Sequence, residues 1–323
     1  MLKIPWIADK EVDYDLVQKL LAPSIKTNQL TNYGPAVKNL ELYFRKHLDL
    51  EDDRCVIAVV NAATGLSVLT KAIQLTDKIK TLQWYTQDFT FPSAIQGFLS
   101  ECKVTDFDQN FELNVDGLQA HYDLDGLIVT NLFGHLVDIK TFQIWAKKEN
   151  KYLIFDNATA GFSYYNHKNC NNYGDGSIIS LHHTKSIGFG EGGLIITLKK
   201  YEKMIRRLIN FGFEVINGHI HSHPCGLNAK MSDISAAYIM AYLESNLDMI
   251  IAQHKKLYDL FVEKIKFIPR VKLLPNYAQQ TVPNCFAVIF DFPIDNNHLQ
   301  QFALHNVMAK KYYNTLKSLT ILY

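Results

Sequence analysis

Two ionisable side chains, Asp156 and Lys185, stand at positions in the sequence that could support chemistry. Asp156 follows the apolar run 152–155, and Lys185 comes shortly after the run 176–180, which ends at Ser180. In open α/β sheets, ligands bind beyond the carboxyl ends of the strands. A carboxylate there can pair with a protonated pyridine nitrogen, and a lysine there can form a Schiff base with an aldehyde. The two residues therefore predict a site for pyridoxal 5'-phosphate (PLP), with Lys185 as the catalytic residue.

Each of these residues also has an ordinary structural interpretation. Asp156 alone is typical of a helix N-cap or a loop, and Lys185 alone is typical of a solvated surface. The setting of Lys185 argues against the second interpretation, because glycines crowd the loop after it: Gly188, Gly190, Gly192 and Gly193. Such glycines indicate a sharp turn or a close approach of the backbone to another group. Partial burial and nearby cations would lower the pKa of the lysine, as a nucleophile requires.

A second group of residues suggests phosphate binding. The turn 61–65 follows the apolar run 56–60 and consists mostly of small residues. Around Ala63 and Thr64, backbone amides at a helix N-terminus can hold an anion without a P-loop lysine. Ser180 can add its hydroxyl to the same phosphate. Turns of this kind are also common as plain scaffolding, so the pattern supports a phosphate site only together with Lys185.

These residues require a fold that brings strand ends together. Between residues 51 and 200, helical patterns such as 66–75 and 141–149 alternate with short apolar runs at 56–60, 126–130, 152–155, 176–180 and 193–197. The runs are typical of strands buried on both faces, and the helices between them imply βα crossovers. The expected fold class is α/β, with a mostly parallel sheet in a large PLP-binding domain.

A different pattern follows Ser232, which is expected to cap a long amphipathic helix that extends toward residue 268. Strand-like and helix-like segments alternate after it, at 271–274, 285–292 and 297–305. We therefore expect a large PLP-binding domain with the N-terminal segment over residues 1–240. A smaller α+β domain is expected over residues 241–323.

Composition narrows the classes of function. The 323 residues are 48% hydrophobic and carry a formal net charge of +1. This balance argues against a nucleic-acid surface or a polybasic membrane patch. The five cysteines are odd in number and lack CxxC spacing, which favours neither a disulfide framework nor a zinc knuckle. Without a signal-like or membrane-length apolar stretch, the sequence predicts a cytoplasmic protein.

The motifs together resemble the DegT-type PLP-dependent nucleotide-sugar aminotransferases, which have the aspartate-aminotransferase fold (fold type I). Five segments carry the resemblance in that family's order: 30–37, 89–91, 156–159, 180–193 and 226–233. They look like the opening segment, the aromatic-threonine-aromatic motif, the aspartate segment, the lysine and glycine-rich signature, and the motif before the long helix. The resemblance extends over about residues 28–247.

This resemblance implies a role for individual residues. Lys185 would carry PLP, Asp156 would pair with the pyridine nitrogen, and Phe91 would stack on the ring, although aromatic clusters are usually core. The implied cofactor-binding residues are Asp156, Phe91, Ser180, Ala63, Thr64, Thr159, Asn228 and Lys185. Asn228 would reach the phosphate across a dimer interface, which implies a homodimer with shared active sites. The implied substrate-binding residues are His182, His183 and Lys230.

The activity implied by the resemblance is amino transfer from L-glutamate to a nucleotide-linked keto-6-deoxyhexose. C4 of dTDP-4-keto-6-deoxyglucose is the expected acceptor, for O-antigen, lipopolysaccharide or other surface polysaccharide biosynthesis. C3 amination of a 3-keto isomer stays open, as do a non-catalytic regulator of the same fold and a nucleotide-binding protein without a covalent cofactor. A PLP-dependent sugar dehydratase is disfavoured, because a histidine replaces the lysine there and Lys185 is present here.

Several positions depart from the family pattern. Thr159 stands where glutamine is usual, and Asn131 stands where histidine is common. Ala62 and Ala63 replace the glycine and threonine of the phosphate turn, so backbone amides must serve there. The sequence ends at Tyr323, earlier than family members usually do, which predicts a small domain that is incomplete or built differently.

His219, His221 and His223 form an alternating stretch whose side chains would share one side of a strand and could bind a metal. The stretch lies between Gly218 and Pro224 and has no acidic partner nearby in the sequence. We therefore expect a loop and no metal site. Such a loop would lie near the sugar-nucleotide entrance, with a histidine against the diphosphate.

Overall fold

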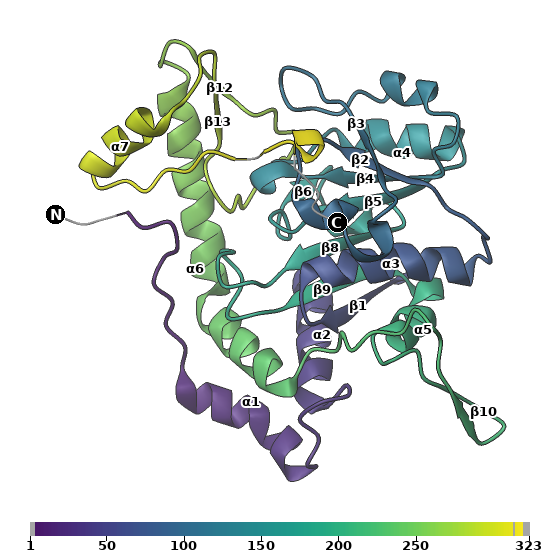
Figure 1. Cartoon of the computed structure of the whole chain (residues 1–323). Coiled ribbons are helices and arrows are strands. Elements are labelled where there is room, and N and C mark those ends of the chain that lie inside the picture. Colours follow the sequence, from purple (N-terminus) through teal and green to yellow (C-terminus); the bar gives the residue numbers. More distant parts are fainter. Residues whose placement is uncertain (1–3, 313, 319–323) are drawn as a thin grey trace.

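The computed structural model describes residues 4–312 and 314–318. The chain folds around a central sheet of seven strands (Figure 1). The strand order is β1-β9-β8-β5-β4-β2-β3. In that order, the bounds are Arg54–Val59, Gly193–Leu198, Gly176–Ser180, Tyr152–Asp156, Gly126–Thr130, Trp84–Gln87 and Lys103–Thr105. Neighbours from β8 to β3 are parallel, whereas β9 is antiparallel to both β1 and β8. The predicted α/β class with a mostly parallel sheet is confirmed.

Helices cover both faces of the sheet because the strands are apolar on both sides. On β9, Ile195 packs into the core under α3 (Ala62–Thr76) and α5 (Lys199–Leu208). Leu194 and Ile196 point the other way, toward the core formed with α1, α2 and α6. The bounds of these three helices are Tyr14–Lys26, Pro35–His47 and Asp233–Ile265, and α4, which covers β4 and β5, spans Ile139–Lys148.

The long helix α6 begins where the sequence predicts. Ser232 is its N-cap, and the Ser232 hydroxyl accepts a hydrogen bond from the Ser235 amide at 3.1 Å. The buried Asp233 carboxylate accepts from the amides of Ala36 at 2.7 Å and Val37 at 3.3 Å, at the start of α2. A negative charge at a helix N-terminus is favourable, so Asp233 joins the starts of two helices. The predicted boundary after residue 240 falls inside α6, and the division into two domains stays a prediction.

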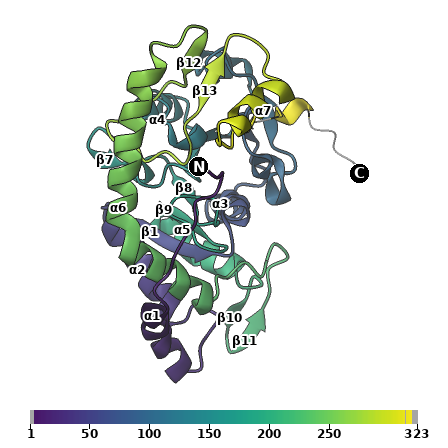
Figure 2. The same ribbon diagram turned by 90° about the vertical axis from the view of Figure 1, so that its left-hand side faces the viewer.

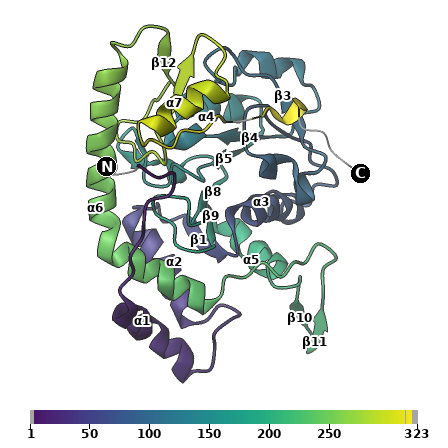
Figure 3. The same cartoon turned by 60° about the vertical axis from the view of Figure 1, so that its left-hand side comes forward.

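The chain beyond α6 forms smaller elements. Strand β12 (Val271–Leu273) pairs antiparallel with β13 (Val288–Phe290), and α7 spans Asn296–Leu304. These elements lie close to their expected positions. In Figure 3, α7 and β12 sit near the upper part of α6. Two further short strands, β6 (Tyr164–Tyr165) and β7 (Lys168–Asn169), pair with each other beside the sheet.

The predicted histidine loop is wrong, because the chain forms a β-hairpin there. Strands β10 (Glu214–Ile216) and β11 (His219–His221) pair antiparallel and project away from the sheet (Figure 2). Asn217 and Gly218 connect them with φ of 52° and 77°, which suits a tight two-residue turn. Among the residues that the structure describes, no three His, Cys, Asp or Glu side chains are placed to hold a metal ion. Within the same residues, no helix is both long and apolar enough to cross a membrane.

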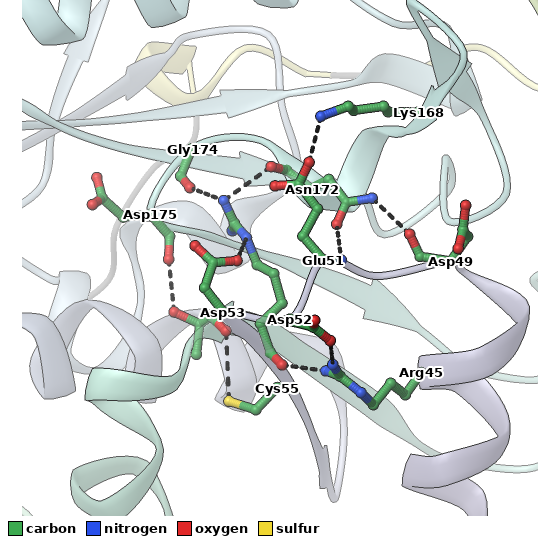
Figure 4. Close-up of polar contacts among 12 residues, drawn as sticks. Arg45, Asp49, Glu51, Asp52, Asp53, Cys55, Lys168, Asn172, Gly174 and Asp175 are labelled. Atoms are coloured by element: carbon green, nitrogen blue, oxygen red, sulfur yellow. Dashed lines mark hydrogen bonds and ion pairs between the residues drawn. The ribbon is translucent and has the colours of Figure 1, made fainter.

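A network of polar contacts lies at the amino ends of β1 and β8 (Figure 4). Arg54, which begins β1, is only 5% exposed and donates to the carbonyls of Asn172 at 3.0 Å and Gly174 at 2.7 Å. The Asn172 side chain accepts from the Glu51 amide at 2.9 Å, and Lys168 pairs with the Glu51 carboxylate. These contacts fix the loop that leads into β8, at the end of the sheet opposite to Asp156.

Candidate active site

The structure brings Asp156 and Lys185 within electrostatic reach of each other. Asp156 is the last residue of β5 and is 3% exposed, and its carboxylate accepts from the Ala158 amide at 3.0 Å. Burial raises the pKa of Asp156, while the Ala158 amide and the Lys185 charge oppose the rise. Burial lowers the pKa of Lys185, while the charges of Asp156 and Cys285 oppose the fall. A lowered pKa leaves more of the Lys185 amine free at neutral pH, which suits a nucleophile.

Beside this pair, β8 and β1 end next to the start of β9. Ser180 ends β8 and lies opposite Gly193 of β9, which in turn lies opposite Val59 of β1. A Cβ atom on Gly193 would lie 2.4 Å from the amide nitrogen of Ala62. Only glycine therefore allows the start of α3 to lie against β9, and this contact places the helix N-terminus beside Ser180.

Helix α3 begins at Ala62, earlier than the start near Leu66 that the sequence predicts. Asn61 is the N-cap, and its side-chain oxygen accepts from the Thr64 amide at 2.8 Å. The Thr64 amide is thus already hydrogen-bonded within the cap. The amides of Ala62 and Ala63 precede it in the first turn, where amides have no partner within the helix and can meet an anion.

The loop that carries Lys185 consists of two successive turns. The Lys185 amide donates to the His182 carbonyl at 2.8 Å, and the Gly188 amide donates to the Lys185 carbonyl at 3.0 Å. A Cβ atom on Gly188 would lie 2.1 Å from the His182 carbonyl oxygen, so the loop folds back closely on itself. The Ser186 amide donates to the side chain of Asn284 at 2.9 Å, which fixes the loop from the C-terminal part of the chain.

The two predicted substrate histidines lie on the same loop, partly buried. The Nδ1 atom of His182 is 2.8 Å from the Thr184 hydroxyl, and its Nε2 atom is 3.3 Å from the Glu191 carboxylate. The His183 ring meets Phe189 edge-on, with ring centroids 5.3 Å apart. Both rings are held within the loop, and their contact with a substrate stays a prediction.

The three residues of the aromatic motif, 89–91, lie in different environments. Phe89 is buried and packs on Phe111, with ring centroids 4.4 Å apart. The Thr90 hydroxyl lies 2.6 Å from the Thr130 hydroxyl at the end of β4. Phe91 is 54% exposed where the chain enters a short 3-10 helix (Pro92–Ile95). Phe91 is therefore accessible for stacking, while the residues before it anchor the motif.

Two of the positions that depart from the family pattern, Thr159 and Asn131, belong to one network behind Asp156. The Thr159 hydroxyl donates to the Asn131 carbonyl at 3.2 Å. The buried Asn131 side chain donates to Asn157 at 2.6 Å and accepts from the Val137 amide at 2.9 Å. The Asn131 amide donates to the Asp156 carbonyl at 3.0 Å. Asn131 thus holds the backbone that carries Asp156, and contact of Thr159 with a cofactor ring stays a prediction.

Asn228 and Lys230 lie along the end of β1 in their own chain. The Val60 amide donates to the Ala229 carbonyl at 2.9 Å. The Lys230 ammonium donates to the Asn228 side chain at 2.7 Å and lies 4.4 Å from the centre of the Phe211 ring. The exposed position of Asn228 leaves its predicted reach into a partner's site as a prediction.

Sequence reasoning missed two side chains beside Lys185. Cys285 is close enough for the Lys185 charge to act on its thiol, whose pKa burial raises to about 11. Lys10 donates to the carbonyls of Lys185 and Gly188. Both residues come from segments far away in the sequence and stand in no motif, so only the folded chain reveals them.

Comparison with known proteins agrees with this geometry. Residues 13–323 match the model of the DegT/DnrJ/EryC1/StrS aminotransferase family. The chain belongs to this family. The resemblance inferred from the motifs is therefore confirmed.

Curated relatives and a solved structure place the chain further within the family. GDP-perosamine synthase of Escherichia coli O157:H7 is 30% identical over 148 residues, which are 45% of this chain and 40% of the relative. dTDP-4-amino-4,6-dideoxy-D-glucose transaminase of Shigella dysenteriae is 26% identical over 197 residues, 59% of this chain and 52% of the relative. The matched regions span about half the length of these relatives. The structure of DesI in the presence of its TDP-sugar product shares the fold, with a TM-score of 0.81 and 20% identity over 98% of this chain and 81% of that chain.

Aminotransferases of this family depend on PLP, as the sequence predicted. The residues present fit that group. The amides at the start of α3 and the Ser180 hydroxyl suit a phosphate, and Gly193 keeps the two close together. The buried Asp156 carboxyl, whose pKa burial raises, would gain a partner from a protonated ring nitrogen. The Lys185 amine would supply the covalent attachment.

Proposed function

We propose that this chain is a PLP-dependent aminotransferase that moves an amino group from L-glutamate to a nucleotide-linked keto-6-deoxyhexose. The single observation that carries the proposal is that the partly buried Lys185 lies within electrostatic reach of the buried Asp156, with the pKa values of both shifted toward the neutral forms. Membership of the aminotransferase family supports the reaction type. We propose C4 of dTDP-4-keto-6-deoxyglucose as the acceptor, in surface polysaccharide biosynthesis such as that of O-antigen. A dTDP-sugar transaminase among the relatives supports this choice.

The residues divide the work of the reaction. Bound PLP stabilises negative charge that develops on the substrate carbon. Asp156 holds the proton on the ring nitrogen, and Phe91 covers one face of the ring. The Lys185 amine would anchor the group covalently, and as a free amine it would carry a proton to and from the substrate carbon. Its lowered pKa suits this task, because a free amine must be available near neutral pH.

We also propose that the working enzyme is a cytoplasmic homodimer with shared sites. Asn228 is exposed beside the start of α3, where a partner chain could approach it. Its amide would bind the phosphate of the partner's site. His182, His183 and Lys230 would meet the sugar nucleotide, because they present polar atoms on the surface around the Lys185 loop and the end of β1. A symmetric dimer would then hold two equivalent sites.

A spectral and product experiment tests the proposal. The purified chain with PLP should show the absorbance band of a Schiff base, and the band should disappear in Lys185→Ala. Lys199→Ala is the matched control, because Lys199 is exposed at the start of α5. L-Glutamate should then convert the spectrum, and incubation with dTDP-, GDP- and UDP-linked 3-keto and 4-keto sugars should yield one amino sugar, identified by mass spectrometry and NMR.

Other outcomes would point to other functions. A chain that binds no PLP would overturn the proposal in favour of a nucleotide-binding protein. PLP binding without any transfer from glutamate would favour another reaction type or a regulator. GDP-sugars belong in the panel because GDP-perosamine synthases stand among the relatives.

A further inference from the structure

An extended segment at the N-terminus, residues 4–12, crosses the face of the molecule between the C-terminal elements and α1. We call it the N-terminal strap. At its start, the Ile4 amide donates to the Asn306 carbonyl at 2.8 Å, and the Met308 amide donates to the Ile4 carbonyl at 3.1 Å. The Trp6 ring stacks on Tyr312, with centroids 5.6 Å apart. In Figure 3, the strap is the purple segment that descends toward α1.

Near its other end, the strap places the ammonium group of Lys10 against the Lys185 loop. The partly buried Lys10 ammonium donates to the carbonyls of Lys185 and Gly188. It also lies 5.0 Å from the centre of the Tyr242 ring on α6, and the Tyr242 hydroxyl donates to the Ser186 carbonyl at 3.1 Å. The backbone carbonyls of the turn 185–188 are therefore held from two separate elements.

The partial burial of Lys10 disfavours its charged form. Burial lowers the pKa of Lys10 to about 8. Burial is the main cause that lowers the pKa values of His183 on the loop and His254 on α6, and the charge of Lys10 lowers both further. Burying an ammonium disfavours the fold unless its donors are used, and the two carbonyls use them. The contact is thus specific to this turn rather than a solvated lysine on a loop.

We propose that Lys10 is a positioning residue that fixes the turn 185–188, so that the amine of Lys185 points toward Asp156. Because the strap is hydrogen-bonded to residues 306–308 at its start, it also couples the C-terminal segment to the reactive lysine. The proposal rests on the proposed function in one respect, that Lys185 is the lysine that carries PLP. The contacts themselves do not depend on it.

The first test measures the turn directly in the full chain. Backbone amide hydrogen exchange is followed by mass spectrometry in peptides covering residues 183–190, with and without PLP. In Lys10→Met, which keeps a long side chain but loses the donors, exchange should be at least tenfold faster. Lys310→Met is the matched control: Lys310 contacts the same strap, 4.7 Å from the Trp6 ring centre, and its loss should leave exchange in these peptides unchanged. Parental exchange in Lys10→Met would overturn the proposal.

The second test measures the reactive amine. The absorbance band of the PLP linkage is titrated with pH in the parent, Lys10→Met and Lys10→Arg. The midpoint should shift in Lys10→Met and return toward the parental value in Lys10→Arg, which keeps a cation and its donors. We call the contacts of the Lys10 ammonium with the carbonyls of Lys185 and Gly188 the clamp. Faster exchange without any shift of the midpoint would show that the clamp does not position the amine, and would also overturn the proposal.

The two tests separate failure of this proposal from failure of the proposed function. If even the parent binds no PLP, the function is wrong, whereas a tenfold exchange difference would still establish the clamp. If Lys10→Met does not fold, Lys10→Gln gives a comparable test, because it removes the charge and shortens the side chain while keeping a polar amide. Exchange in Lys10→Gln should then lie above the parental rate, and parental exchange in this variant would count against the clamp.

Discussion

Both ends of the central sheet bury charged groups, but they stabilise them differently. At the amino ends, burial lowers the pKa of Arg54, yet a guanidinium stays charged at any ordinary pH. Arg54 therefore needs partners, and it donates to the carbonyls of Asn172 and Gly174. At the carboxyl ends, burial shifts Asp156 and Lys185 toward their neutral forms. At the amino ends, a permanent charge holds loops through hydrogen bonds. At the carboxyl ends, two titratable groups are available to meet a ligand.

The comparison shows where stability and function separate in this fold. Hydrogen bonds from a buried charge to backbone carbonyls stabilise the folded state, and removing the charge leaves those carbonyls without partners. A buried acid and a partly buried amine, each shifted toward its neutral form, destabilise the cofactor-free chain, because the unfolded chain keeps them solvated. Substitutions at the two ends should therefore have opposite effects, and the following predictions test that difference.

The largest expected effect is on activity in Lys185→Met. Turnover should fall by more than about 10³-fold, because the proton carrier at the substrate carbon is lost. The cofactor-free variant should be at least as stable as the parent. Since the folded pKa lies below the unfolded value, the cost of Lys185 is full below the folded pKa, falls as pH rises from the folded to the unfolded pKa, and is absent above the unfolded pKa. The stability advantage of the variant should thus shrink with rising pH, measured by urea unfolding; a variant less stable than the parent at pH 7 would break the comparison.

Asp156→Asn should reduce turnover by about 10²-fold or more, since a preorganised charge at the reacting group is lost. Here the pH dependence is reversed. The folded pKa of Asp156 lies above the unfolded value, so stability is lost as pH rises from the unfolded pKa to the folded pKa. The cofactor-free variant should match the parent at low pH and exceed it at high pH in the same urea experiment. Wild-type turnover would show that Asp156 is not the partner of the ring nitrogen.

Arg54→Met tests the amino ends. The variant should lose about 2 kcal/mol of unfolding free energy, because two buried carbonyls lose a charged donor. Turnover per folded molecule should stay within about twofold of the parent, since loops at the opposite end do not touch the site. Both values come from urea unfolding and steady-state rates on the same preparation. Equal stability of variant and parent would remove the contrast between the two ends.

The smallest effect is expected for Asp52→Asn, in the same region of the chain. The Asp52 side chain is fully exposed and lies 3.4 Å from Arg45, and exposed pairs of this kind contribute little. The change in unfolding free energy should stay within about 0.5 kcal/mol. A larger loss would mean that the amino-end network extends to the surface, and Arg54 would then be only one part of it.

The sequence predicts those parts of the fold that depend on local patterns. Continuous apolar runs mark the strands, and the strand ends place Asp156 and Ser180 at one edge. The Ser232 cap follows from a polar residue directly before an amphipathic helix. By contrast, the early start of α3 was missed, because the turn after Asn61 lacks apolar periodicity.

Other features could not be predicted, because they depend on contacts between distant segments or on strands without a pattern of buried residues. Lys10 and Cys285 approach Lys185 from far away in the chain, so no local spacing could reveal them. Residues 219–223 of the β10–β11 region were predicted as a loop because Gly218 and Pro224 flank the histidines. In fact Val215 and Ile220 pair across the two strands, and both are exposed, so no burial pattern marked them.

The antiparallel pairing of β8 with β9 has a consequence for how this chain could be altered. Ser180 and Gly193 are direct neighbours across the two strands, so residues 181–192 leave and re-enter the sheet at points about 5 Å apart. A loop closed by such a stem has nearly the same end geometry whatever its length, and changing its length alters the closure entropy only slightly. We therefore expect that the loop of residues 181–192 can be replaced by the corresponding loop of another family member without changes to the strands that flank it.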